Sequence, residues 1–298
     1  MDKVTDKFTD KFTDKFTDNP KKISTYICGC VRNCAQYLPA VFSNIAKITP
    51  LFDDYKIVIA YDNSTDKSLR ILCDMKRQFP KLEILINRNA TGSIRTQNIA
   101  NARNELLRYM RADRTFDYFI MIDMDDVCAG NMNVSVLQKY IDIERNNNTT
   151  SWDALSFNRP CYYDAWALSI EPYVFSCWHF PKGREVVMKM RDYISKKLQS
   201  NSGNLLECMS AFNGFAIYRL SAFDGVIYEW DVQKNVEIIQ NCAIPLLIEN
   251  TAKAVGQPLS WHRGDDCEHR YFHIRATQQN GARICISPEI LFTDYVDG

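Results

Sequence analysis

The sequence predicts an α/β domain with a mostly parallel central sheet. Apolar runs rich in Ile, Val and aromatic residues alternate with amphipathic segments over residues 23–122. Unbroken apolar runs are typical of parallel strands that are buried on both faces. Strands that alternate with helices pair in parallel through right-handed crossovers. A chain of 298 residues can form one large domain of this class or two smaller ones, and we expect one compact domain.

Each element of the first half has its own signal. Apolar runs predict strands at residues 23–31, 55–61, 82–86 and 116–122. Apolar residues at helical spacing predict helices between these strands, at residues 37–48, 69–79 and 98–110. The turn over residues 62–66 carries Asp, Asn and Ser side chains, which favour the start of the helix that follows it.

The second half is less regular, and the amino terminus is repetitive. We expect helices near residues 186–198 and 267–279, and strands near residues 215–218 and 282–287. Residues 2–17 are tandem tetrapeptides of the form Asp-Lys-(Val/Phe)-Thr. Because so few apolar groups cannot offset the entropy of ordering, the sequence predicts a disordered tail over residues 1–20.

The composition excludes several classes of protein. Lys and Arg (36) balance Asp and Glu (36), so no basic field indicates a nucleic-acid partner or an anionic membrane surface. No run approaches the roughly 18 apolar residues of a transmembrane segment, and the polar amino terminus is not a secretory signal. The 11 cysteines are odd in number and most lie in apolar segments, where a reduced thiol packs like a small hydrophobic residue. These features favour a cytoplasmic location.

Three carboxylates, Asp123, Asp125 and Asp126, follow directly on the fourth predicted strand. Side chains at the carboxyl ends of parallel strands face the crevice in which open α/β sheets bind ligands. Two carboxylates one residue apart suit a hard divalent cation that also takes oxygen ligands from substrate phosphates. The alternative is an acidic loop that only caps the next helix, which is the role that we expect for Asp126.

In their order along the chain, these motifs resemble the GT-A nucleotide-sugar-dependent glycosyltransferases over roughly residues 23–290. The segments that carry the resemblance are Val31-Arg32-Asn33, Asp62-Asn63-Ser64-Thr65-Asp66, Arg95, Ala102-Arg103-Asn104 and Asp123-Met124-Asp125. The resemblance implies a Rossmann-like GT-A domain over residues 21–298, with a nucleotide-binding half (21–130) and an acceptor-binding half (131–298). It implies a UDP- or GDP-linked sugar as the donor. The residues that would contact this donor are Asn33, Asp62, Asn63, Arg95, Arg103 and Asp123.

The chemistry of such a transfer explains these residue types. Breaking a sugar–phosphate bond leaves negative charge on the nucleoside diphosphate, and a Mn²⁺ or Mg²⁺ ion stabilises this charge as a Lewis acid. By the resemblance, Asp125 and Asp123 would bind the ion. Arg103 would add a fixed bidentate charge, or it is an exposed helix residue that pairs with Glu105. For Asp62, the alternative role is an Asx-turn.

A second signature of the family lies late in the chain, where a Glu-Asp pair opens a helix and Phe, Arg, Gly and Pro follow. The residues that fit it are Glu268, Phe272, Arg275, Gly281 and Pro288, and His269 replaces the usual Asp. In inverting members this Asp is the base that deprotonates the acceptor hydroxyl. The resemblance therefore leaves Glu268, Asp266 or His269 as the catalytic group, or else a retaining enzyme that needs no such base, and retention is favoured. His273, one helical turn after His269, is predicted as a further metal ligand, with a structural role as the alternative.

Two central segments, residues 161–168 and 211–218, are similar to the fungal capsule-associated mannosyltransferase family. This similarity implies a retaining transfer of a hexose. Trp166 and Tyr163 are predicted to stack on sugar faces, with packing in the core as the alternative. Asn213, next to Gly214, is predicted to lie where the donor or the acceptor approaches the backbone closely.

The sequence therefore predicts a metal-dependent glycosyltransferase that moves a hexose or N-acetylhexosamine to a glycan or other hydroxyl acceptor. One alternative is a sugar-1-phosphate nucleotidyltransferase, but residues 29–33 contain a single Gly where such enzymes have a Gly-rich phosphate loop. A metallohydrolase built on His269, His273 and Asp265 or Asp266 would leave the acidic turn unexplained. A non-enzymatic glycan-binding module would need neither acidic turn.

Overall fold

The computed structural model describes residues 20–87, 92–146, 151–201, 203–242, 245–260 and 263–294. The tail predicted over residues 1–20 lies, except for Pro20, outside the described residues. Within the described residues, the strands form one sheet in the order β3-β2-β1-β4-β7-β5-β8-β6. The strands are β1 (Ser24–Val31), β2 (Asp54–Tyr61), β3 (Leu82–Ile86), β4 (Tyr118–Ile122), β5 (Ala154–Asn158), β6 (Leu206–Cys208), β7 (Phe215–Arg219) and β8 (Ile284–Ile290).

Parallel pairing dominates the sheet. β1 pairs in parallel with β2 and β4, β2 with β3, and β5 with β8. β7 pairs antiparallel with β4 and β5, and β6 pairs antiparallel with β8. The predicted single α/β domain with a mostly parallel sheet is confirmed.

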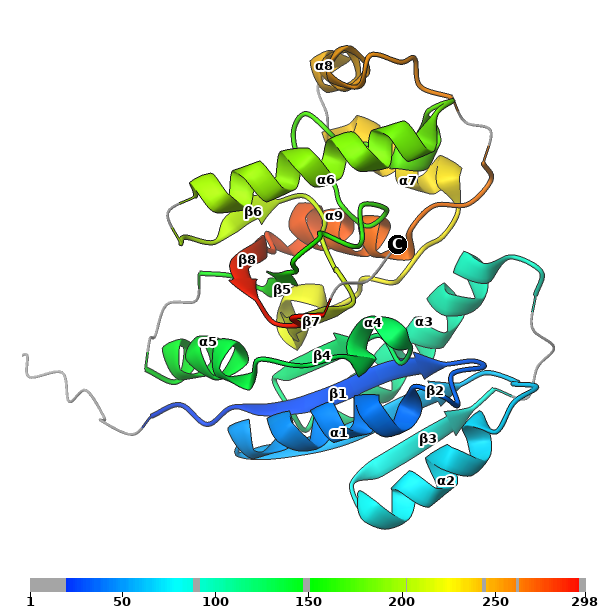
Figure 1. Cartoon of the computed structure of the whole chain (residues 1–298), viewed down its shortest axis with the longest axis vertical. Coiled ribbons are helices and arrows are strands. Elements are labelled where there is room, and N and C mark those ends of the chain that lie inside the picture. The colour runs from blue at the N-terminus through cyan, green and yellow to red at the C-terminus, as the bar shows by residue number, and fades with distance from the viewer. Residues whose placement is uncertain are drawn as a thin grey trace, which may run out of the picture.

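Helices cover both faces of the sheet (Figure 1). The α-helices are α1 (Leu38–Ile48), α2 (Ser68–Gln78), α3 (Arg95–Asp113), α4 (Asp126–Ala129), α5 (Val134–Asn146), α6 (Gly183–Ser200), α7 (Val232–Cys242), α8 (Pro245–Val255) and α9 (Glu268–Asn280). Short 3-10 helices are η1 (Thr49–Leu51), η2 (Cys177–His179) and η3 (Leu220–Phe223). One hydrophobic cluster joins α1, α2 and α5 to one face of the sheet, and a second joins α3 and α9 to the other face. Burial of these apolar faces is the main stabilising term of such a fold.

α9 lies between the sheet and a further helical layer. Phe272 and Ala276 pack in the cluster on the sheet, whereas Ile274 packs with α6, α7 and α8 in a third cluster. Figure 1 shows α6, α7 and α8 toward the end of the molecule opposite α1 and α2. α9 is therefore covered by protein on two sides, and its amino end meets α3.

The elements up to β4 lie close to their predicted positions, but α4, α5, β5, β6, α7 and α8 were not predicted. β6 has three residues, and β5 is interrupted by the buried polar side chain of Ser156, so neither strand leaves a clear apolar run. No described helix is long and apolar enough to cross a membrane. The cysteines whose side chains the structure describes are free thiols.

Candidate active site

A crevice of about 280 Å³ opens at the carboxyl ends of β1, β2 and β4, and we call it the strand-end crevice. The predicted residues that line it are Asn33 after β1, Asp62 after β2, Asp123 and Asp125 after β4, and Arg95 and Arg103 on α3. Parallel strands bring their carboxyl ends to one edge, which explains why these distant residues meet. Asn63 is exposed and does not line the crevice.

The acidic turn after β4 is held by backbone contacts. The backbone N–H of Asp123 donates to the Gly214 carbonyl oxygen at 2.9 Å. The Asp125 carboxylate accepts the N–H of Val127 at 3.3 Å, so Asp125 is the N-cap of α4. The capping role that we expected for Asp126 therefore belongs to Asp125, because α4 begins at Asp126, one residue earlier than that expectation required.

The two crevice carboxylates form a partial donor set for a divalent cation. Burial and the neighbouring Asp125 raise the pKa of Asp123 above its usual range, and burial and Asp126 raise the pKa of Asp125. This mutual repulsion is what a bound cation would relieve. The described residues contain no cluster of three or more His, Cys, Asp or Glu side chains that could hold an ion. Mg²⁺ is, however, usually bound by one or two carboxylates, and substrate phosphates and water supply its other ligands. Asp123 and Asp125 therefore fit such an ion.

Arg103 links the acidic turn to α9. Its Nη2 lies 3.2 Å from Asp123 Oδ1, and its Nη1 forms an ion pair with Glu268 Oε1. The guanidinium carbon lies 4.9 Å from the centre of the Phe212 ring, a cation–π contact. The alternative of an exposed Arg103 paired with Glu105 is wrong, because the Arg103 side chain is buried.

Asp62 lies where the strand-end crevice meets a hollow of about 770 Å³ beside β2 and β3. Its Oδ1 accepts the backbone N–H of Asn63 at 2.9 Å and the side-chain amide of Asn87 at 3.0 Å. Asp62 therefore lies in the crevice, and its carboxylate contacts the N–H of the next residue instead of forming the Asx-turn that was the alternative. Asn33 has a positive φ of 54° and accepts the Thr65 N–H at 2.8 Å, which joins the turns after β1 and β2.

Residues 26–223 match the family model described as glycosyl transferase family 2. This chain belongs to glycosyl transferase family 2. Among solved structures, residues 1–349 of S. aureus TarS in complex with UDP-GlcNAc are similar, with 14% identity and a TM-score of 0.49 over 93% of this chain and 60% of that chain. The mannosyltransferase PcManGT from Pyrobaculum calidifontis in complex with GDP-Man and Mn²⁺ has 11% identity and a TM-score of 0.47 over 93% of this chain and 58% of that chain. This chain thus spans about three fifths of the length of these two chains. No curated protein matches it.

In this family member, the side chains predicted as catalytic groups are all engaged within the protein. The Glu268 side chain is buried against Arg103. Asp266 is fully buried, and it accepts Arg270 Nε at 3.1 Å and Trp166 Nε1 at 3.2 Å. These contacts give Asp266 a structural role and do not support the prediction that it is the base.

His269 is also buried, with its ring stacked on Phe212 at 3.9 Å between centres. Neither of its ring nitrogens has a hydrogen-bond partner in the described part of the chain. Burial lowers the pKa of His269 well below its usual value. The geometry does not support His269 as a base, because its nitrogens do not reach a solvent-accessible site.

The geometry does not support the prediction of His273 as a metal ligand. His273 Nδ1 hydrogen-bonds Ser210 Oγ at 2.9 Å, and Nε2 hydrogen-bonds the Tyr218 hydroxyl at 3.1 Å. Both ring nitrogens are therefore used, and burial lowers the pKa of His273 to about 3. The helix face that His269 and His273 share packs into the core, not toward the acidic turn.

Asn213 was predicted to border a ligand, but its side chain holds a loop. Its Oδ1 accepts the backbone N–H groups of Tyr163 and Asp164, both at 3.0 Å, and its Nδ2 donates to the Phe157 carbonyl. Gly214 has φ +86°, and a Cβ there would lie 2.4 Å from the Val127 side chain. The close approach that the glycine permits is thus made by the start of α4 and not by a ligand.

Asp164 is a site residue to which the sequence led us to assign no role. Its Oδ1 accepts the Ala167 N–H at 2.9 Å, and its carboxylate also interacts with the backbone N–H of Asn213. Burial raises the pKa of Asp164, and its charge in turn raises the pKa of Asp123. The available signal was a carboxylate between Tyr163 and Trp166, two residues that were already predicted to face a sugar.

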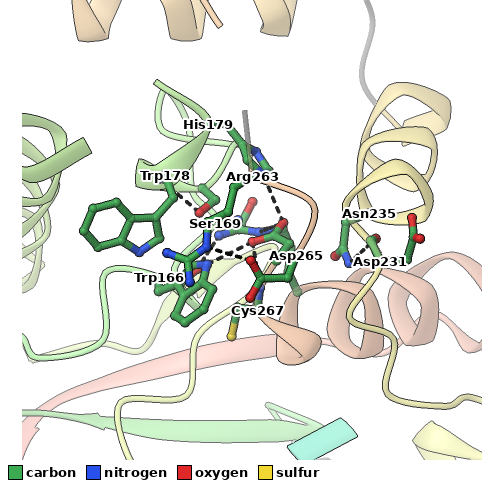
Figure 2. Close-up of polar contacts among 12 residues, drawn as sticks. Trp166, Ser169, Trp178, His179, Asp231, Asn235, Arg263, Asp265 and Cys267 are labelled. Carbon is green, nitrogen blue, oxygen red and sulfur yellow. Dashed lines mark hydrogen bonds and ion pairs between the residues drawn. The ribbon is translucent and has the colours of Figure 1, made fainter. Parts of the chain in front are cut away.

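A second pocket, of about 530 Å³, is lined in part by the loop that contains Asp164. We call it the tryptophan pocket; the residues that define it are Tyr163, Asp164, Trp166, Trp178 and the α6 side chains Arg184, Val187, Met188 and Arg191. Figure 2 shows Trp166 and Trp178 with Arg263 close to both, and the Arg263 guanidinium carbon lies 4.7 and 5.7 Å from the two ring centres.

Proposed function

We propose that this chain transfers a hexose or N-acetylhexosamine from a UDP- or GDP-linked sugar to a hydroxyl acceptor, with Mn²⁺ or Mg²⁺. One observation carries the proposal: carboxylates from the β4 turn and arginines from α3 line the same crevice at the strand ends. Carboxylates hold a divalent cation and arginines bind phosphate oxygens, so this combination fits a nucleoside diphosphate bridged by a cation.

The crevice suggests an orientation for the donor. Asp62 lies between the strand-end crevice and the hollow beside β2 and β3, whose lining includes the amides of Asn87, Asn98 and Asn101. Amide side chains can both donate to and accept from a nucleobase. We therefore place the base in this hollow, the ribose at Asp62 and the diphosphate at Asp123 and Asp125.

The residues of the crevice have distinct tasks in this mechanism. Asp123 and Asp125 would hold the metal ion, and the ion, when bound, stabilises the leaving nucleoside diphosphate as a Lewis acid. Arg103 keeps a positive charge beside Asp123, and Glu268 fixes its position, so no reorganisation is needed when negative charge develops. Arg95, exposed at the start of α3, is free to contact the outer phosphate oxygens.

We favour a retaining transfer, which is what the sequence similarity of residues 161–168 and 211–218 to the fungal capsule-associated mannosyltransferase family implies. The three side chains predicted as bases, Glu268, Asp266 and His269, are all buried in contacts with other protein groups. Anomer-resolved NMR of the product tests this point directly, and an inverted product would contradict it. The metallohydrolase alternative has no support, because His269 and His273 lie in the core.

The proposal is tested by replacing Asp125 with Asn, which keeps an N-cap residue for α4 and removes the charge. The matched control is Asp126→Asn, because Asp126 is an exposed carboxylate on the next residue that does not line the crevice. We expect Asp125→Asn to lose more than the roughly 10- to 100-fold that follows loss of an outer partner of a metal ligand. Turnover of UDP- and GDP-sugars and a thermal shift with Mn²⁺ or EDTA would be measured. Normal turnover in Asp125→Asn, or an equal donor-induced shift in EDTA, would refute the assignment.

A further inference from the structure

One face of α6 forms a wall of the tryptophan pocket. Arg184, Val187, Met188 and Arg191 follow the i, i+3, i+4, i+7 spacing that places residues on one helix face, and all of them line the pocket. Met188 is 72% exposed, a large value for an apolar side chain in a pocket wall. This face of α6 is thus open, with an apolar centre and a cation at each end.

The two arginines of this face have no carboxylate partner among the described residues. Arg184 is exposed and makes no ion pair with the described part of the chain. Arg191 donates from Nη2 to the Tyr163 carbonyl oxygen at 2.9 Å, and its buried Nε has no acceptor. Elsewhere on α6, by contrast, Lys196 pairs with Asp192 at 2.7 Å. Arg184 and Arg191 are thus unpaired cations of α6 that line the pocket, whereas Lys189 donates to the Val255 carbonyl oxygen and Lys197 lies over the Tyr193 ring, both outside the pocket lining.

The opposite part of the pocket offers flat aromatic surfaces. Trp166 and Trp178 both line it, and Arg263 lies over both rings (Figure 2). Arg263 is paired with Asp265 at 2.7 Å, so its charge is balanced. Large aromatic faces suit the apolar faces of sugar rings.

Asp164 shows where the tryptophan pocket lies relative to the strand-end crevice. It is the only acidic residue among the described residues that line the pocket, and a carboxylate that accepts the Ala167 N–H still has lone pairs for a ligand hydroxyl. The Asp164 backbone N–H donates to Asn213 Oδ1 at 3.0 Å, and the next residue, Gly214, accepts the Asp123 N–H at 2.9 Å, so Asp164 lies near the acidic turn of the crevice. A sugar hydroxyl that donates to Asp164 would therefore lie on the side of the pocket next to the donor.

We propose that the tryptophan pocket binds the acceptor, and that this acceptor is a saccharide carrying an anionic group, a carboxylate or a phosphate. Arg184 and Arg191 outnumber the single carboxylate, so the pocket attracts anions. Guanidinium groups match the two oxygens of a carboxylate or phosphate with paired N–H donors. The sugar ring stacks on the tryptophans and one of its hydroxyl groups donates to Asp164. The inference rests on the proposed transfer reaction and names the class of its acceptor.

The test is an NMR titration of the whole chain with four probes: mannose 6-phosphate, glucuronic acid, neutral methyl α-mannoside and inorganic phosphate. We expect at least one of the two anionic sugars to bind at least tenfold more tightly than methyl α-mannoside and inorganic phosphate. The stronger of the two identifies the anion as phosphate or carboxylate. In Arg184→Gln/Arg191→Gln the tenfold preference should disappear, whereas Lys196→Gln, which removes a charge from another face of α6, should keep it.

Equal binding of neutral and anionic sugars would overturn the proposal, as would an unchanged preference in the double variant. If inorganic phosphate binds as tightly as mannose 6-phosphate, the pocket is an anion site and the saccharide part is refuted. The Mn²⁺-dependent thermal shift by nucleotide sugars, measured on the same proteins, reports on the strand-end crevice separately. If wild type shows no such thermal shift, the proposed transfer is contradicted. If wild type shows the thermal shift but no preference for anionic sugars, only the inference about the acceptor is contradicted.

Discussion

Replacing Arg103 with Met would remove the guanidinium that joins Asp123 to Glu268 while keeping an apolar stem. The Arg103 and Glu268 side chains are only 7% and 6% exposed, so the substitution would leave Glu268 as a buried carboxylate without its cation. Removing one partner of a buried ion pair costs about 3–5 kcal/mol. We therefore expect the free energy of unfolding to fall by about 4 kcal/mol, which lowers Tm by roughly 10 °C for a domain of this size.

This loss should depend on pH, with a sign that follows from Glu268. Burial raises the pKa of Glu268 and Arg103 lowers it, so the substitution raises this pKa further. When folding raises the pKa of a carboxyl group, the group stabilises the folded state at pH values below its ordinary pKa of 4.5. This stability is lost as the pH rises through the pKa of the folded state. The gap in stability between wild type and Arg103→Met should therefore widen as the pH rises from 4.5 toward neutrality.

The assay is urea unfolding at pH 5.0 and pH 7.5 in the presence of EDTA. Arg108→Met is the matched control, because Arg108 is an exposed arginine of the same helix that pairs with Glu105. Such a surface pair contributes about 0–1 kcal/mol. Adding Glu268→Gln to Arg103→Met should recover part of the loss at pH 7.5. The reasoning fails if Arg103→Met costs no more than the control, or if its cost is the same at both pH values.

Two further predictions concern residues whose expected roles the structure changes. His273→Leu should cost about 1–3 kcal/mol, because two buried hydroxyl groups lose their partner, and Mn²⁺ affinity measured by titration should not change; weaker binding would make His273 a ligand after all. Asp266→Asn should cost about 3 kcal/mol, because Arg270 loses its buried counter-charge, as a shift in the urea midpoint would show. A variant that kept full stability but lost transfer would instead identify Asp266 as the base.

The first half of the fold and the strand-end crevice could be predicted from local patterns. Each of β1, β2 and β4 is a buried apolar run, and the helices between them show a clear amphipathic period. Once the strands are parallel, the residues that follow them must meet at one edge. The positions of Asp62 and Asp123 in one crevice therefore follow from topology alone.

The surroundings of α9 and the loop near Asp164 could not be predicted in this way. α9 buries charged and polar side chains, such as Glu268 and Arg270, so its sequence does not show which face is buried. The spacing of His269 and His273 therefore predicts a shared direction but not what lies in that direction. The Asp164 loop has no regular structure and is positioned by the Asn213 amide, 49 residues away in the chain. Such long-range contacts leave no periodic signal in the sequence.

α9 also has a consequence for the order in which substrates bind. Its first residue, Glu268, holds Arg103 in the strand-end crevice, and two residues later the buried Arg270 donates to the carbonyl oxygens of Trp166 and Leu168 beside the tryptophan pocket. A single stiff element thus supports both pockets. If a ligand in one pocket shifts α9, the affinity of the other pocket changes, and thermodynamic reciprocity requires the same factor in both directions. Competition between the two substrates, or cooperation between them, is therefore set by one helix.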